Sequence, residues 1–472
     1  MAEKDTIISV SKVLAVPGGT GISKAHVDIM LREDIPVHCI NRGTQKKRLM
    51  PFNVLYNNNN VFWRQGGGWE YFITGEDFEK IKEKAVSKHS NWETETADRK
   101  SGESNKPDPH QGYGNEYKTI STMTIAEKIQ QLNSHKQRLN SLIMYKSKDE
   151  TTVTEALVDT ARDAALINRA ALEEAMRLGD GEAKKITQEL VNSTTEMVKS
   201  STALFAENIF NDKLMNILVE KSNGTIVQHM TRVYLNGISF LLFYNNLVST
   251  SSAINKLRIS FAAKYRDFYH RLLPHIPIDN IVLERVFYKG MRAIPPELFF
   301  NWAVGFLIHD IGKASAVEYH EGGSAYNRNI VIEHVKMGYQ AVMNKTNYPM
   351  EASLITGYHH EYYGDPAGYG YFRAYLEQHR RENPGAKQDY CITYELEPIM
   401  EFQALAYFPA KVLEIIDVYD SVIDPSRAHH KASTPEEALT MIRAEFIEKY
   451  HKLDPILFDL FAEFIREKQK NI

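Results

Sequence analysis

Apolar residues recur at intervals of three and four along most of the chain from about residue 123 onward. The segments IAEKIQQLNSHKQRLNSLI and VTEALVDTARDAALINRAALEEAMRL show this spacing clearly, and it predicts amphipathic helices through 123–214. Two further apolar runs, 237–244 and 297–308, are shorter than the roughly 18–20 residues of a membrane span and are interrupted by polar residues. We expect both runs to be buried helices.

The first 86 residues follow a different pattern. Two aromatic-rich runs flank a glycine cluster in VFWRQGGGWEYFIT (61–74), which is a hairpin signal, and DFEKIKEKAV (77–86) predicts a short helix. Residues 87–122 are polar and contain few aliphatic side chains, so they cannot bury enough apolar surface to offset the entropy of ordering. We therefore predict a mainly α chain with four parts: a small α+β N-terminal domain (1–86), a polar linker (87–122), a helical connector (123–214) and a helical catalytic domain (215–472).

Two alternatives remain open for the connector. A long helical segment between a small domain and a catalytic domain is suited to a dimerisation stalk, which would make the protein a homodimer. The same periodicity is equally compatible with helices that pack on their own chain. The apolar spacing does not separate these alternatives, because both bury one face of each helix.

Composition and charge exclude several classes of protein. The 472 residues are 43% hydrophobic and 25% charged, which is an ordinary globular composition that favours two or three domains. The formal net charge is only -4, so no global field attracts DNA, RNA or an anionic membrane. Cys39 and Cys391 cannot form a disulfide framework, and the start MAEKDTIISV lacks the features of a signal peptide. We expect a cytoplasmic protein without a membrane span.

Histidines and aspartates recur in the C-terminal half at positions that favour metal chemistry. FLIHDIGK (306–313) places His309 beside Asp310 at the end of an apolar helix, and EHVKMGY (333–339) places His334 on another predicted helix. His359 and His360 follow, and AKVLEIIDVYDSV (410–422) presents Asp417 on a buried helix, where an unpaired carboxylate is costly. Each residue alone has an ordinary structural explanation, but imidazole and carboxylate donors together suit iron, manganese or zinc.

The ordered set HDIGK, HxxxG, HHE, a loop containing Gly-Tyr, and DxxDS resembles the HD-GYP branch of the HD phosphohydrolase superfamily. The resemblance covers roughly residues 215–445 and implies an all-helical HD-type catalytic domain, with insertions near 245–295 and 371–400. It also implies an upstream histidine, for which we choose His229 over His270 and His275, whose surroundings differ from those of the expected helix. The implied metal ligands are His229, His309, Asp310, His334, His359, His360 and Asp417.

So many donors imply at least two divalent ions, with iron or manganese favoured, and the resemblance gives Asp310 the bridging position. Some family members hold a third ion through an additional glutamate near the first histidine. Here Thr225 stands one turn before His229, and Glu220 is the nearest upstream acid. We therefore prefer two ions and leave a third open.

The resemblance further implies hydrolysis of cyclic di-GMP to pGpG and onward to GMP by a metal-activated hydroxide. Asp310 and Lys313 would be catalytic, and the residues that would contact the substrate are Lys313, Arg427, Lys431 and Tyr369. The loop HHEYYGDPAGYG (359–370) departs from the family pattern, with one extra residue and Gly370 in place of a proline. Two alternatives therefore stay open: a signalling module that binds cyclic di-GMP with little or no turnover, and a phosphohydrolase acting on another cyclic dinucleotide or nucleotide.

Overall fold

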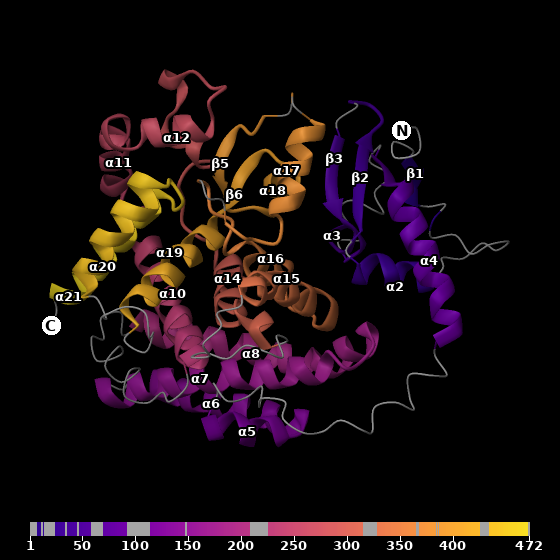
Figure 1. The fold of residues 1–472 in the computed structure, drawn as a ribbon. Helices are drawn as coiled ribbons and strands as arrows, with labels where there is room; N and C mark the ends of the chain where they lie inside the picture. Colours follow the sequence, from indigo (N-terminus) through magenta and orange to yellow (C-terminus); the bar gives the residue numbers. More distant parts are fainter. Residues whose placement is uncertain are drawn as a thin grey trace. The chain divides into compact units, whose positions relative to one another are not determined.

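A computed structural model provides the fold (Figure 1). It describes residues 7–10, 13, 24–33, 35–44, 47–57, 69–91, 114–146, 149–207, 225–314, 328–364, 368–383, 385, 387–424 and 434–470. The described residues are mainly helical, which confirms the predicted fold class. They form two compact units, and the smaller one combines Met1–Pro107 with Arg373–Lys387 and Met400–Phe402.

The smaller unit contains an antiparallel sheet with strand order β1-β4-β2-β3. Val37, Leu49 and Ile73 are fully buried in it. The second half of the predicted hairpin is β4, which pairs with β1 and β2, whereas 61–68 lie outside the described residues. The elements of the sheet and its helices are β1 (Ile7–Ser9), α2 (Lys24–Arg32), β2 (Pro36–Asn41), β3 (Lys47–Pro51), α3 (Phe52–Asn57), β4 (Trp69–Thr74) and α4 (Gly75–Asn91).

Helix α17 (Arg373–Glu382) packs on β3 in this unit, although it comes from the segment expected as an insertion in the catalytic domain. The His379 ring stacks on Phe402 with centroids 3.7 Å apart. Arg48 is buried, forms an ion pair with Glu401 at 2.6 Å and lies 3.9 Å from the centroid of the Trp69 ring. Residues distant in sequence thus complete the smaller unit.

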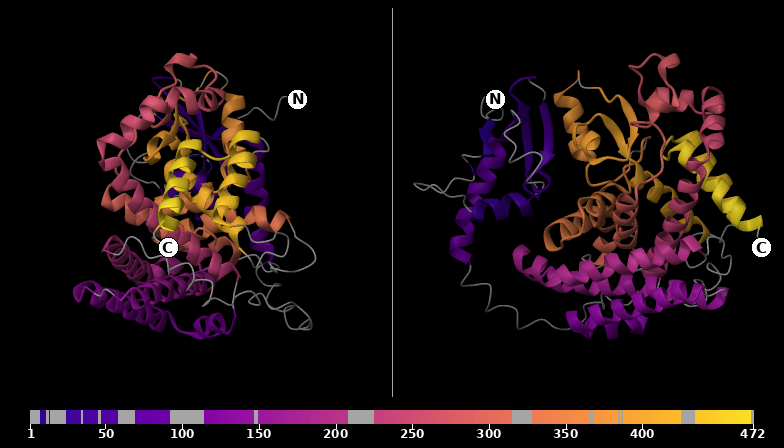
Figure 2. Two further views of the ribbon diagram at one scale, coloured as in Figure 1. Left: turned by 90° about the vertical axis from the view of Figure 1, so that its left-hand side faces the viewer. Right: turned by 180° about the vertical axis from the view of Figure 1, so that it is seen from behind.

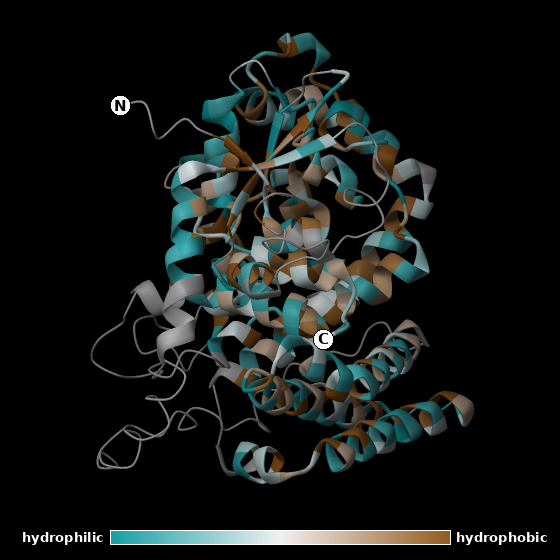
Figure 3. Cartoon of the chain, turned by 90° about the vertical axis from the view of Figure 1, so that its right-hand side faces the viewer, coloured by the Kyte–Doolittle hydropathy of each residue, from teal (hydrophilic) through white to brown (hydrophobic). Residues whose placement is uncertain are grey.

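The larger unit begins with long helices, which Figure 2 shows side by side in purple and magenta. The four helices are α5 (Gly114–Thr122), α6 (Ile125–Met144), α7 (Glu150–Ala175) and α8 (Asp180–Glu207). Thr124 and Glu127 form a capping box that satisfies the first amides of α6. Hydrophilic and hydrophobic positions alternate along these helices in Figure 3, as expected for amphipathic helices.

The connector packs on its own chain. Helix α7 contacts α10 (Thr225–Ser249) and α14 (Pro296–Ile308), and α8 contacts α15 (Arg328–Lys345). Hydrogen bonds join α8 to the end of α15, including Thr187 Oγ1 to the Lys345 carbonyl at 3.0 Å. Of the two alternatives for this segment, packing on its own chain is therefore present, and a homodimer through it stays a prediction.

The two apolar runs lie in α10 and α14, and most residues of 237–244 and of 302–308 are buried. After α10 come four short helical elements, which are α11 (Ser251–Lys264), α12 (Arg266–Leu272), η2 (Ile278–Asn280) and α13 (Leu283–Val286). That 245–295 is an insertion stays a prediction. None of the described helices is long and apolar enough to cross a membrane.

The remaining elements of the larger unit come from the chain after α14. Strands β5 and β6 pair in parallel, so the larger unit is not entirely helical. Helix α19 follows β6 directly, and it packs on α10 and α16. These elements are η3 (Ile311–Ala314), α16 (Met350–Tyr358), β5 (Tyr390–Thr393), α18 (Leu396–Met400), β6 (Ala404–Tyr407), α19 (Phe408–Ile423), α20 (Pro435–Ile442), the π-helix η4 (Arg443–Lys449) and α21 (Pro455–Lys470).

Candidate metal centre

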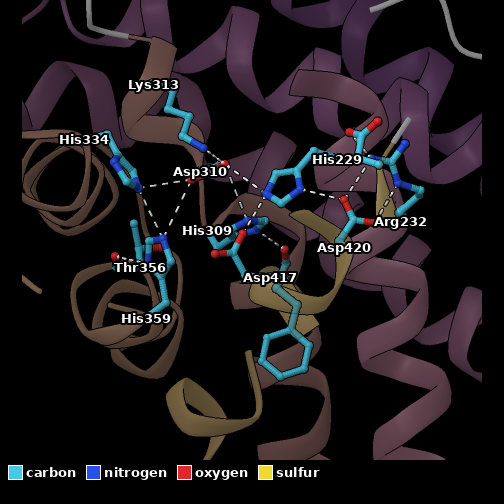
Figure 4. A network of polar contacts seen from close by, with 12 residues as sticks. His229, Arg232, His309, Asp310, Lys313, His334, Thr356, His359, Asp417 and Asp420 are labelled. Atoms are coloured by element: carbon cyan, nitrogen blue, oxygen red, sulfur yellow. Dashed lines mark hydrogen bonds and ion pairs between the residues drawn. The ribbon is translucent and has the colours of Figure 1, made fainter. Parts of the chain in front are cut away.

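Asp310 lies between two groups of imidazoles in the larger unit (Figure 4). Its Oδ1 lies 3.1 Å from His334 Nε2 and 3.7 Å from His359 Nε2. Its Oδ2 lies 3.4 Å from His229 Nε2 and 3.7 Å from His309 Nε2. One carboxylate therefore presents a different oxygen to each group of histidines.

These side chains lie on, or directly after, five different helices. His229 comes from α10, His334 from α15 and Asp417 from α19, while His309 follows α14 and His359 follows α16. Two sets have ligand atoms close enough to share an ion, namely His334, His359, His360 and His229, His309, Asp310. Asp417 Oδ1 lies 2.8 Å from His229 Nε2, at the edge of the second set. The structure thus brings together all seven residues predicted as ligands.

Backbone carbonyls orient two of the histidines. His309 Nδ1 donates to the Phe306 carbonyl at 2.9 Å, and His359 Nδ1 donates to the Thr356 carbonyl at 2.7 Å. A carbonyl can only accept, so Nδ1 carries the proton in the neutral ring and Nε2 keeps its lone pair. Both rings therefore present an electron pair toward Asp310, which is the state that a metal ion requires.

A carboxylate and a guanidinium fix the orientation of His229. Asp420 Oδ2 accepts a hydrogen bond from His229 Nδ1 at 2.8 Å. The Arg232 guanidinium donates hydrogen bonds to both carboxylate oxygens of Asp420, at 2.6 and 2.8 Å. It also donates to Asp424 at 2.6 Å. Asp420 and Arg232 were given no role from the sequence. Their spacing was a usable signal, since each stands three residues after a predicted ligand and so shares its helix face.

Burial lowers the pKa of three of these histidines, His309, His334 and His360. It lowers the pKa of His309 to about 3, and it lowers the pKa of His360 well below its ordinary value. For Asp310, burial raises the carboxyl pKa, but nearby Lys313 and His309 outweigh burial and bring the pKa well below the ordinary value. Neutral imidazoles and an ionised carboxylate are the forms that bind metal ions.

His229 is the exception among the histidines. Burial acts against its charged form, but hydrogen bonds to Asp417 and Asp420 outweigh that effect and raise its pKa to about 9. Without a metal ion, His229 is therefore protonated, and its positive charge offsets the negative charges of Asp417 and Asp420. A cation placed beside Asp310 and Asp417 could take over that balancing role, because metal binding releases protons from its ligands.

Two glycines allow the close packing that places His334 beside Asp310. A Cβ at Gly312 would lie 1.9 Å from the His334 carbonyl oxygen, and a Cβ at Gly338 would lie 2.7 Å from Thr356 Cγ2. Both positions exclude any larger side chain unless α15 moves. The glycines of HDIGK and HxxxG thus bring η3 and α15 into direct backbone contact.

The loop after His360 differs from the family pattern for a structural reason. Gly370 N donates to the His360 carbonyl at 3.1 Å, a hydrogen bond that proline cannot make because it lacks an N–H. Tyr369 then lies against His360, with ring centroids 4.3 Å apart. The substitution of glycine for proline is therefore compatible with a loop that still covers the histidines.

The other predicted residues have these positions. Lys313 Nζ donates to Asp310 Oδ2. Arg427, Lys431 and Glu220 lie outside the described residues. His270 and His275, the alternatives to His229, belong to neither set of candidate ligands among the described residues.

The comparisons with known proteins give one structural likeness. No protein-family model matches the chain, and no curated protein matches it. Among solved structures, the chain is similar to Bd1817, an HDG"Y"P protein from Bdellovibrio bacteriovorus, at 11% sequence identity and a TM-score of 0.35. The alignment covers 98% of this chain and 99% of that protein.

Proposed function

We propose that this protein is a metal-dependent phosphodiesterase that holds two divalent ions, one on each side of Asp310. The position of the Asp310 carboxylate carries this proposal, since its oxygens face separate groups of histidines. In many enzymes that hydrolyse phosphate esters, two ions a few ångströms apart stabilise the attacking and the leaving oxygen. A carboxylate shared between the ions, as proposed for Asp310, would hold them at such a separation.

Buried nitrogen atoms without hydrogen-bond partners support the binding of a cation at this site. His309 Nε2 and His360 Nδ1 are buried and have no hydrogen-bond partner among the described residues. Buried polar groups in folded proteins are nearly always hydrogen-bonded or bound to an ion, because desolvation without a partner is costly. One set of ligands would be His334, His359 and His360, and the other His229, His309 and Asp417, with Asp310 shared. Mixed imidazole and carboxylate donors favour iron or manganese.

When bound, the ions supply a water of lowered pKa and neutralise charge on a phosphoryl oxygen. The residues of the chain would bind the substrate and orient the metal ligands. Lys313 holds a positive charge beside Asp310, where it can neutralise a phosphate oxygen of the substrate. Asp420 and Arg232 keep His229 oriented. The Tyr369 ring lies against the His360 ring within the loop 359–370.

For the substrate we propose cyclic di-GMP, hydrolysed to pGpG and onward to GMP. The order of the motifs HDIGK, HHE and Gly-Tyr supports this choice, because it resembles that of cyclic di-GMP phosphodiesterases. Lys313, Tyr369, Arg427 and Lys431 remain the proposed substrate contacts.

Anaerobic assays with Mn²⁺ or Fe²⁺ test this function. The purified chain should convert cyclic di-GMP to pGpG or GMP, and Asp310→Ala should abolish turnover. Asp459→Asn is a suitable control, because Asp459 lies on α21 and contacts Tyr265 rather than the site. Metal bound without hydrolysis of cyclic di-GMP, cyclic di-AMP or a simple phosphodiester would contradict the proposal.

A further inference from the structure

Half-buried aromatic rings and a lysine gather beside the candidate metal centre, on the side of His360. We call Tyr362, Phe446, Tyr450 and Lys452 the Tyr362 cluster. The Tyr362 ring lies 6.2 Å from the His360 ring and 6.4 Å from the Phe446 ring, in edge-to-face arrangements. Lys452 Nζ lies 5.7, 5.3 and 4.9 Å from the ring centroids of Tyr362, Phe446 and Tyr450.

Backbone contacts hold this cluster against the loop that follows the paired histidines. Tyr363 N donates to the Lys452 carbonyl at 3.1 Å, and Lys452 N donates to the Phe446 carbonyl at 2.7 Å. A Cβ at Gly364 would lie 1.7 Å from the Tyr450 carbonyl oxygen, so only glycine permits this approach. The metal-binding loop and the segment 446–452 therefore form one continuous structure, although about 85 residues separate them in the sequence.

The backbone of the cluster is irregular. Phe446 lies on the π-helix η4, and His451 has a positive φ of 49°. Single π-helical turns and left-handed non-glycine residues cost conformational energy and occur often at functional sites. Here Phe446, Tyr450 and Lys452 lie together at a turn before α21, whereas a regular helix would turn Lys452 away from the face that Phe446 and Tyr450 share.

Lys452 has aromatic rings, and no carboxylate, as its neighbours among the described residues. Among the described residues no carboxylate lies within ion-pair distance of it, whereas its neighbour Lys449 pairs with Glu445 at 3.0 Å. A cation among aromatic faces, half open to solvent, is the chemistry that binds nucleobases: rings stack on the base, and an ammonium donates to its polar edge. Guanine offers two acceptors, N7 and O6, on one edge, where adenine offers an acceptor and a donor.

We propose that the Tyr362 cluster is the subsite that receives a guanine base of the substrate, and that it selects guanine over adenine through Lys452. This inference rests on the proposed function, because it places a nucleobase next to the phosphodiester held at His360. None of its residues belongs to the metal ligands, and three of them lie beyond the segment that resembles the HD-GYP family.

The test compares substrates with and without nucleobases. Lys452→Met and Phe446→Leu are assayed with Mn²⁺ on cyclic di-GMP, cyclic di-AMP and bis(p-nitrophenyl) phosphate, a diester that carries no nucleobase. Lys82→Met is the matched control, because Lys82 lies over the Phe78 ring at 4.4 Å in the smaller unit. Both test variants should raise KM for cyclic di-GMP about tenfold, as expected for loss of one stacking or cation contact.

Rates on bis(p-nitrophenyl) phosphate should not change, and Lys452→Met should affect cyclic di-GMP more than cyclic di-AMP. Equal losses on all three substrates would show that the cluster only supports the loop, and no loss on cyclic di-GMP would also overturn the subsite. If the wild-type protein hydrolyses none of them, the proposed function fails, and calorimetric titration with GMP decides the subsite separately. Weaker GMP binding by Lys452→Met would then support it, and unchanged binding would refute it.

Discussion

His229 and Asp420 are separated by 191 residues, yet the Nδ1 of one meets the Oδ2 of the other at 2.8 Å. Arg232 holds the same carboxylate with two hydrogen bonds from the opposite side. This arrangement fixes the His229 ring with Nε2 turned toward Asp310 and Asp417. The relation resembles the carboxylate–histidine pairs that orient ligands around metal ions in other proteins.

Asp420→Asn should therefore weaken metal binding. The amide keeps the size of the side chain, but it removes the charge that orients His229 and pairs with Arg232. Loss of such a partner lowers metal affinity by about 10–100-fold. Mn²⁺ titration of Asp420→Asn and of the control Asp459→Asn measures the effect, and equal affinities in the two variants would contradict the orienting role.

Gly312→Ala should destabilise the larger unit and disrupt the site. Its Cβ would lie 1.9 Å from a backbone oxygen, so relief requires movement of α15, which carries His334. Overpacking of this kind costs about 1–3 kcal/mol of unfolding free energy. Gly179→Ala is the matched control, because a Cβ there meets nothing within 4 Å. Urea unfolding should separate the two variants, and equal midpoints would argue against the tight contact.

Gly370→Pro should lower activity, even though proline stands at this position in the HD-GYP motif that the loop resembles. Proline removes the N–H that donates to the His360 carbonyl, a hydrogen bond worth about 1 kcal/mol. Gly370→Ala provides the comparison, because it adds a Cβ near Glu361 but keeps that N–H. A proline variant that is as active and as stable as the alanine variant would show that the hydrogen bond does not matter.

Asp454 should make stability depend on pH. Burial raises its pKa to about 6, although hydrogen bonds from Leu457 N and Tyr269 Oη act in the opposite direction. Below about pH 3 the group is protonated in both the folded and unfolded chains. As pH rises toward 6 the unfolded chain loses the proton first, so this group disfavours folding by an amount on the order of 3 kcal/mol above pH 6.

Asp454→Asn should remove that dependence while keeping the acceptor for Leu457 N. The unfolding free energy of the variant, relative to wild type, should therefore increase between pH 4 and pH 7. Denaturant titrations of both proteins across this range provide the measurement. A difference that stays constant with pH would mean that Asp454 titrates normally.

The fold class and the local elements of the site were predictable because they depend on short-range patterns. Periodicity at three and four residues predicted the helices of the connector, and His309, Asp310 and His334 each stand at a fixed place on a helix or its end. The choice of His229 over His270 needed the resemblance, since both lie on helices.

Long-range pairings were not predictable in the same way. Asp420 and Arg232 meet only because α10 and α19 pack together, and a single sequence does not encode that contact locally. Helix α17 is a clear helix in sequence, but nothing in its periodicity indicates that it packs on β3 of the N-terminal sheet. The Tyr362 cluster likewise depends on an irregular turn at 446–452.

The number and coupling of bound ions test the central claim most directly. Protein loaded anaerobically with Mn²⁺ should contain two ions per chain by elemental analysis, and its electron paramagnetic resonance spectrum should show two coupled Mn²⁺ ions. Asp310→Ala should abolish that coupling, because it removes the carboxylate shared by the two groups of histidines. A single uncoupled ion in the wild-type protein, with Asp310→Ala binding it equally well, would contradict the two-metal site.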